Sequence, residues 1–127
     1  GECYNTGTTG ATETAIGKGS TNTTVIINQG AGGIGYAAAL ARAYNGGEYT
    51  DWFLPSKDEL NEMYQYQTII NNTATTYGGS IFSNIYWSST ESQGWNTWHQ
   101  FFDGTIPSQN AYGSMNNTYG VHSVRAF

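Results

Sequence analysis

The sequence predicts an α+β fold, with helices in the first half of the chain and strands and turns in the second half. One observation is the alanine-rich segment 36–44, and another is a helix-capping pattern that begins at Ser56. After Ile81 the pattern changes to short alternating runs between polar turns, which is typical of antiparallel sheets. A chain of 127 residues has the length of one domain, so we expect residues 1–127 to form a single domain.

The chain before the alanine-rich segment carries weak signals. Residues 1–21 are rich in Gly and Thr and are expected to be irregular or extended. Within segment 23–28, three β-branched residues in a row favour a short strand, although one or two helical turns also fit. Segment 30–35 holds four glycines, but their spacing matches neither a P-loop nor a dinucleotide-binding motif. We therefore expect a turn that leads into the next helix.

Residues 36–44 are predicted to form that helix, because alanine is the best helix former. Its apolar face would hold Leu40, Ala41 and Tyr44, which lie at helical spacing. The apolar run 52–54 then predicts a short buried strand, which the following proline ends.

The clearest helix prediction covers residues 56 to about 69. Ser56 and Glu59 have the spacing of a capping box, in which each side chain binds the backbone N–H of the other residue. The buried stripe is expected to consist of Leu60, Met63 and Tyr64. The polar segment 71–80 contains two consecutive glycines and predicts a loop.

The last third of the chain predicts strands. In segment 85–90, Ile85, Trp87 and Ser89 alternate with their neighbours, as expected of a half-buried strand. Segments 99–102 and 121–127 are further strand candidates.

The composition points to a binding protein and excludes several partners. Only 10% of the residues are charged and the net charge is −5, so no basic patch could neutralise a nucleic acid. No apolar run approaches the length that crosses a membrane, so direct membrane insertion is not expected. Many Tyr, Ser, Gly and Asn residues form the mixture found in antibody binding loops. An ordinary β-rich extracellular domain has the same mixture, so this alternative stays open.

We expect no catalytic site, no metal site and no cofactor. His99 and His122 are the only histidines, and we interpret them as surface or contact residues rather than as parts of a catalytic triad. Cys3 is the single cysteine, so it either pairs with another chain or stays reduced. Glu91 is expected to cap a turn. Arg125 is expected to form a structural ion pair, with Glu91 as the candidate partner, rather than to contact an anionic ligand.

Several motifs in a fixed order resemble the bacterial DUF1566 domain family. They are Asp51-Trp52-Phe53-Leu54-Pro55-Ser56-Lys57-Asp58-Glu59-Leu60, Tyr86-Trp87-Ser88-Ser89-Thr90-Glu91, then Trp98, Phe102 and Gly104, and finally Val124-Arg125-Ala126-Phe127. The resemblance runs from about Thr14 to Phe127. It implies a C-type lectin-like fold, with two main helices, a small antiparallel sheet and long loops. The chain departs from the common pattern at Met115 and at His122.

A narrower resemblance concerns residues 87–127, which are similar to the variable region of proteins diversified by retroelements that mutate template adenines. In such proteins the mutated codons never encode Trp, Gln, Glu or Met. This implies that Gln93, Trp95, Trp98, Gln100 and Gln109 belong to the scaffold, although Trp95 could also be a fixed ligand anchor. The implied variable, ligand-binding positions are Ser92, Gly94, Asn96, His99, Phe101, Asp103, Thr105, Ile106, Pro107, Ser108, Asn110, Ala111, Tyr112, Ser114, Asn116, Asn117, Tyr119 and His122.

The two resemblances imply a non-enzymatic binding domain with a hypervariable surface. Its ligand would be a protein or glycan on a target cell, and Phe101 and Tyr112 would be the leading aromatic anchors. The implied location is extracellular or surface-displayed, on a bacterium or a phage particle. The alternative is a structural domain of a pilus, tail fibre or surface protein that is not diversified.

Overall fold

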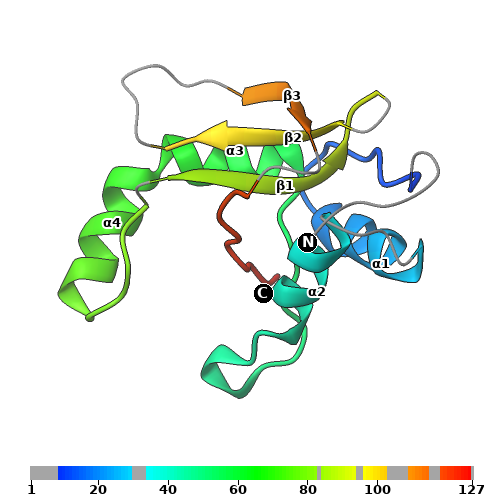
Figure 1. The fold of residues 1–127 in the computed structure, drawn as a ribbon. Coiled ribbons are helices and arrows are strands. Elements are labelled where there is room, and N and C mark those ends of the chain that lie inside the picture. The colour runs from blue at the N-terminus through cyan, green and yellow to red at the C-terminus, as the bar shows by residue number, and fades with distance from the viewer. Residues whose placement is uncertain are drawn as a thin grey trace.

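The computed structural model describes residues 9–29, 34–82, 84–93, 96–102, 109–114 and 118–126. Within these ranges helices and a three-stranded antiparallel sheet follow one another, so the predicted α+β class is confirmed. The elements in chain order are α1 (Gly19–Gln29), α2 (Ile34–Ala43), the short 3-10 helix η1 (Gly46–Glu48), α3 (Lys57–Gln65), α4 (Gln67–Thr76), β1 (Ile85–Glu91), β2 (Asn96–Phe101) and β3 (Gln109–Ser114). Helix α3 lies behind the sheet, α1 and α2 lie below β1, and α4 projects away from the rest (Figure 1).

Helix α1 shows that segment 23–28 is helical, so the favoured strand is wrong and the helical alternative is confirmed. The segment expected to be irregular ends before Gly19. Tertiary burial overrides the strand preference of the β-branched residues. Thr23 and Ile26 point into the core, whereas Ile27 is exposed, which is a helical pattern. The Thr23 hydroxyl also donates to the Gly19 carbonyl at 2.7 Å, so the helix itself satisfies this buried polar group.

Helix α2 matches the predicted helix 36–44 closely, but it buries a different face. Ala37, Ala38 and Ala41 are buried, whereas Leu40 is 47% exposed and Tyr44 is 51% exposed. The three alanines pack against Ile26 of α1 in one apolar cluster. Small side chains let the two helices approach closely, so the large residues lie outside the contact.

The predicted strands 52–54 and 121–127 are both wrong as strands, although the two segments touch. Phe53 and Val124 form one isolated antiparallel bridge, with N···O distances of 2.8 and 2.9 Å. The ladder does not continue past Leu54, because the next hydrogen-bonding position of an antiparallel pair is two residues on, and Pro55 has no N–H to donate. The Pro55 carbonyl accepts from the Ser89 backbone N–H instead.

The predicted helix 56–69 is in fact two helices, α3 and α4. The capping box is confirmed, since the Ser56 hydroxyl accepts from the Glu59 backbone N–H at 3.2 Å and Glu59 accepts from that of Ser56 at 2.7 Å. Leu60 is buried, with Met63 and Tyr64 packed against the same cluster as predicted.

The break between α3 and α4 falls at Tyr66, whose φ of −100° and ψ of 14° lie outside the helical region. Helix α4 then occupies most of the predicted loop 71–80. Its threonine side chains do not compete with the helix, because Thr75 and Thr76 donate to the carbonyls four residues earlier at 2.8 and 2.9 Å.

The sheet has the order β1–β2–β3. Strand β1 confirms the predicted strand 85–90, and β2 begins three residues earlier than the predicted strand 99–102. Strand β3 was not predicted, because its sequence Gln-Asn-Ala-Tyr-Gly-Ser contains few residues that favour strands. Backbone pairing with β2 forms this strand in spite of its composition.

The expectation that β1 is half-buried is wrong, since Trp87 and every later residue of β1 are buried. The polar residues tolerate burial because their hydroxyls find carbonyl acceptors. Ser88 donates to Trp98 at 2.8 Å, Ser89 to Pro55 at 3.1 Å, and Thr90 to Glu13 at 2.8 Å. Because hydrogen-bonded polar residues are buried here, β1 does not alternate between buried and exposed residues, as the predicted half-buried strand would.

Candidate functional site

The motif residues near Pro55, in β1 and near Val124 meet in space. The Ser89 backbone N–H donates to the Pro55 carbonyl at 2.7 Å, and the Lys57 N–H donates to the Thr90 hydroxyl at 2.9 Å. The bridge between Phe53 and Val124 joins the third motif to the first. The residues of the three motifs therefore connect the segment before α3 with β1 and with the segment around Val124.

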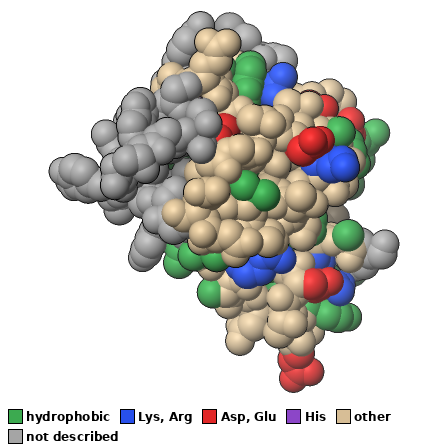
Figure 2. Space-filling view, turned by 90° about the vertical axis from the view of Figure 1, so that its right-hand side faces the viewer, with side chains coloured by type: hydrophobic (Ala, Val, Ile, Leu, Met, Phe, Trp, Pro, Cys, Tyr) green, Lys and Arg blue, Asp and Glu red, His purple; other side chains and the backbone are tan. Residues whose placement is uncertain are grey.

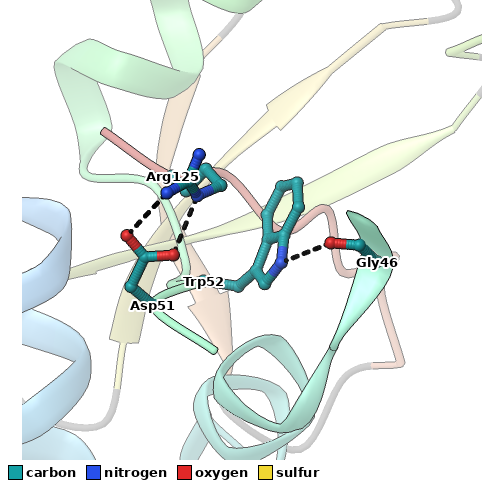
Figure 3. Close-up of polar contacts among 4 residues, drawn as sticks. All are labelled: Gly46, Asp51, Trp52 and Arg125. Atoms are coloured by element: carbon teal, nitrogen blue, oxygen red, sulfur yellow. Dashed lines mark hydrogen bonds and ion pairs between the residues drawn. The ribbon is translucent and has the colours of Figure 1, made fainter. Parts of the chain in front are cut away.

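Arg125 forms a structural pair, as expected, but its partner is Asp51 and not Glu91. The guanidinium donates from Nε to Asp51 Oδ1 at 2.8 Å and from Nη2 to Oδ2 at 3.1 Å (Figure 3). Its Cζ also lies 3.6 Å from the centroid of the Tyr49 ring. The hydrogen bond from Arg125 lowers the pKa of Asp51. Because Asp51 is exposed, solvent screens this pair and its contribution to stability is small.

The Glu91 carboxylate binds backbone groups elsewhere in the chain. It is buried and accepts from the backbone N–H groups of Thr9 at 2.7 Å and Gly10 at 3.1 Å. Glu91 therefore binds backbone N–H groups of a segment far along the chain, which forms a bend at Gly10 rather than a turn. Trp52, which follows Asp51 in the chain, is also fixed by a hydrogen bond. Its Nε1 donates to the Gly46 carbonyl at 3.1 Å (Figure 3).

An open groove of about 550 Å³ lies against β2 and β3, next to the residues that directly follow β1. This size is typical of a ligand-binding site. Its described lining residues are Ser92, Gln93, Asn96, Trp98, Gln109, Asn110 and Ala111. They come from the residues that follow β1, from β2 and from β3, so residues far apart in the sequence form one concave surface.

The base of this groove is braced against helix α3. The Gln109 side chain donates from Nε2 to the Lys57 carbonyl at 2.7 Å and to Gln100 Oε1 at 3.0 Å. Gln100 is fully buried and donates in turn to Asn61 Oδ1 at 3.1 Å. The Lys57 ammonium lies 4.1 Å from the centroid of the Trp98 ring, a cation–π distance. Two groove residues, Trp98 and Gln109, are thus held in fixed orientations.

Four predicted variable residues lie in the groove, namely Ser92, Asn96, Asn110 and Ala111. The resemblance assigns Gln93, Trp98 and Gln109 to the scaffold, and the structure places these three residues in the groove as well. Lys57 was not predicted to contribute, and no feature of the sequence links it to Trp98, because only the fold brings α3 against β2.

Other predicted variable residues pack in the interior. His99 is only 4% exposed, so the interpretation of His99 as a surface residue is wrong. Its ring lies 4.8 Å from that of Tyr119, which in turn lies 4.5 Å from Trp87. Phe101 is half-buried, with its ring 5.5 Å from His99.

His122 is half-buried rather than a surface residue. Its ring centroid lies 4.7 Å from that of Phe82 and 6.1 Å from that of Tyr86. It also lines a second hollow of about 290 Å³ together with Tyr44 and Trp52. This position is separate from the groove.

The remaining predicted positions cannot be placed in the site. Tyr112 and Ser114 belong to β3, but their side chains lie outside the described residues. The following positions and scaffold candidates lie outside the described residues altogether: Cys3, Gly94, Trp95, Asp103, Gly104, Thr105, Ile106, Pro107, Ser108, Met115, Asn116, Asn117 and Phe127.

Figure 2 shows the right-hand side of Figure 1, where α1 lies, and the charged side chains visible there among the described residues are scattered rather than gathered in one patch. In the described part of the chain, no three His, Cys, Asp or Glu side chains are grouped so that they could hold a metal ion. None of the described helices is long and apolar enough to span a membrane.

Burial of both histidines makes stability depend on pH. Burial lowers the pKa of His99 and of His122 below the usual value of 6.5. As the pH falls below 6.5, the two histidines become protonated in the unfolded chain but stay neutral in the folded protein. The free energy of unfolding therefore decreases until the pH reaches the lower pKa of the folded state. Well above pH 6.5 both histidines are neutral in the folded and in the unfolded state, so they add no pH dependence there.

We therefore expect urea denaturation to give a lower free energy of unfolding at pH 5.5 than at pH 7.5. In the double variant His99→Gln, His122→Gln this difference should shrink. An unchanged difference in the double variant would show that carboxylates, not the histidines, cause it.

Comparisons with known proteins gave no match: no family model, no curated protein and no solved structure matches this chain.

Proposed function

We propose that this chain is a non-enzymatic binding domain of the DUF1566 type with a C-type lectin-like fold. In this proposal a retroelement diversifies residues of its C-terminal region, and the groove against β2 and β3 contacts a ligand on a target cell. The domain acts outside the cell or on the surface of a bacterium or phage particle. It needs no metal or cofactor.

The observation that carries the proposal is the composition of the groove. Four positions that the resemblance marks as variable line it together with three that it marks as constant, namely Gln93, Trp98 and Gln109. The constant residues Trp98 and Gln109 are braced by helix α3, whereas Ser92 and Asn96 lie near the β1–β2 connection. A rigid frame below exchangeable contact residues is the arrangement that lets one fold serve many ligands.

Sequencing of this gene throughout its source population tests the diversification directly. We expect substitutions concentrated at the variable positions and arising from template adenines. Substitutions spread evenly along residues 9–126 would reject diversification.

Tolerance of the groove to substitution provides an independent test in the purified protein. Asn96 and Gln100 are both amide residues of β2, but Asn96 is half-buried at the groove and Gln100 is fully buried. Asn96→Ser should change the free energy of unfolding by less than about 0.5 kcal/mol. Gln100→Ser should lower it by about 2 kcal/mol, because Gln109 and Asn61 lose their buried partner.

Chemical denaturation of the two variants beside the parent protein measures this contrast. Equal losses would mean that the groove position is as constrained as the core position, which argues against a variable surface.

A structural subunit is the second candidate, and helix α4 favours it. Large hydrophobic side chains are exposed on and beside this helix, at Tyr66, Ile69, Tyr77 and Ile81. A surface of this kind would be covered if copies packed side by side. Sedimentation velocity over a range of concentrations separates the two functions, since assembly that Ile69→Glu abolishes would favour the structural role.

A further inference from the structure

We propose that the groove binds a neutral saccharide and that Trp98 and Gln109 are its constant contact residues. This inference rests on the proposed binding function and names the ligand class for the same groove. It follows from the orientation of Gln109, the position of Trp98 and the absence of charge among the described lining residues.

The hydrogen bonds of Gln109 fix which of its atoms faces a ligand. The Lys57 carbonyl can only accept, so the nitrogen of the Gln109 amide, and not its oxygen, must point toward Lys57. The same nitrogen also donates to Gln100 Oε1, and these two bonds use both of its hydrogens. Gln109 Oε1 is therefore left as an oriented acceptor in a residue that lines the groove. Its natural partner is a ligand O–H or N–H donor.

Trp98 supplies an apolar surface next to this acceptor. Its ring lines the groove, and the Lys57 ammonium over the ring holds the indole in position. One residue, Lys57, thus positions both anchors, Trp98 through its ammonium and Gln109 through its carbonyl. A ligand that fits them must present a hydroxyl beside an apolar C–H face, as a pyranose ring does.

The rest of the described lining favours a neutral ligand. Ser92, Gln93, Asn96 and Asn110 carry hydroxyl or amide groups, which both donate and accept hydrogen bonds as sugar hydroxyls do. None of the described lining side chains is ionised, and the nearby Lys57 ammonium is engaged by the Trp98 ring. The described lining itself therefore offers a charged ligand no counter-charge. Ala111 is the one aliphatic side chain among them, so the described lining lacks the apolar pocket that anchors a peptide side chain.

The test is titration of the ¹⁵N-labelled protein with a panel of neutral mono- and disaccharides, followed by NMR. We expect at least one saccharide to shift the Trp98 indole N–H and the Gln109 side-chain amide signals. Trp98→Ala should weaken its affinity about tenfold or more, whereas Trp98→Phe should retain part of it. Gln109→Met, which keeps the chain length but removes the acceptor, should also weaken it about tenfold.

Tyr77→Ala is the matched surface control, because Tyr77 is 84% exposed and does not line the groove, and it should bind like the parent protein. The dispersion of the amide spectrum shows for each variant that the fold is intact. The inference is overturned if no saccharide shifts these signals at its highest soluble concentration, or if Trp98→Ala folds and binds unchanged.

A random peptide display library separates this inference from the proposed function. Peptides that bind in a Trp98-dependent manner, with no saccharide binding, would overturn the saccharide inference and leave a binding domain. Population sequencing that shows evenly spread substitutions would instead reject diversification, whatever the saccharide result.

Discussion

Gly19→Ala is expected to lower the free energy of unfolding by roughly 3 kcal/mol, the range of severe overpacking. Gly19 begins α1 and is buried where the chain crosses the start of α3. A Cβ at this position would lie 2.8 Å from both the Leu54 carbonyl oxygen and the Ser56 nitrogen, and it would collide with the Glu59 carboxylate. Leu54 and Ser56 present backbone atoms, which cannot move aside as a flexible side chain can.

The expected loss of stability has the opposite sign to the change that helix propensity predicts for this substitution. Helix propensity alone predicts that Gly→Ala stabilises a helix by up to about 1 kcal/mol. Urea denaturation and thermal melting would measure the loss, which corresponds to a decrease in Tm of about 10 °C.

Gly79→Ala is the matched control, because a Cβ there would make only an ordinary contact, 3.4 Å from the Ala74 Cβ. It should stay within about 0.5 kcal/mol of the parent protein. A Gly19→Ala variant as stable as this control would refute the close approach of α1 to the start of α3.

Thr90→Val is expected to cost about 3 kcal/mol, although valine has nearly the same shape as threonine. The Thr90 hydroxyl donates to the Glu13 carbonyl at 2.8 Å. It also accepts from the Lys57 backbone N–H at 2.9 Å and, more weakly, from the Asn22 side chain at 3.4 Å. One hydroxyl thus uses its single hydrogen and both lone pairs to connect β1 with three other parts of the chain.

Thr90→Ser provides the control, because it keeps the hydroxyl and removes only a methyl group. It should lose no more than about 1 kcal/mol, a typical cost for one buried methyl group. Equilibrium urea denaturation of both variants measures the contrast. If valine and serine cost the same, shape rather than hydrogen bonding would account for the role of Thr90.

Signals that depend on neighbouring residues were read correctly from the sequence. The capping box of Ser56 and Glu59 works because the two residues lie on the same first turn, and the structure forms it as predicted. The alanine-rich helix and the strand at 85–90 follow from local preferences as well. The class of the fold follows from the order of these elements.

Predictions for residues whose partners lie far along the chain were wrong. The three β-branched residues of α1 favoured a strand, because the sequence does not show that Thr23 and Ile26 are buried by segments far along the chain. The partner of Arg125 was misassigned for the same reason, since Glu91 already binds the Thr9 and Gly10 amides.

For the groove, too, the sequence predicted the types of its residues, and the tertiary structure decided their contacts. The resemblance predicts residues of constant type, such as Trp98 and Gln109, and others that vary. Only the tertiary structure placed Lys57 against both of them and showed which atom of Gln109 remains for a ligand. By itself the sequence determined the α+β class, the capping box, the alanine-rich helix and the strand at 85–90, because capping, propensity and alternation act between near neighbours. The buried faces, the ion pair and the groove were decided by the tertiary structure, because they arise from competition for partners that only the folded chain brings together.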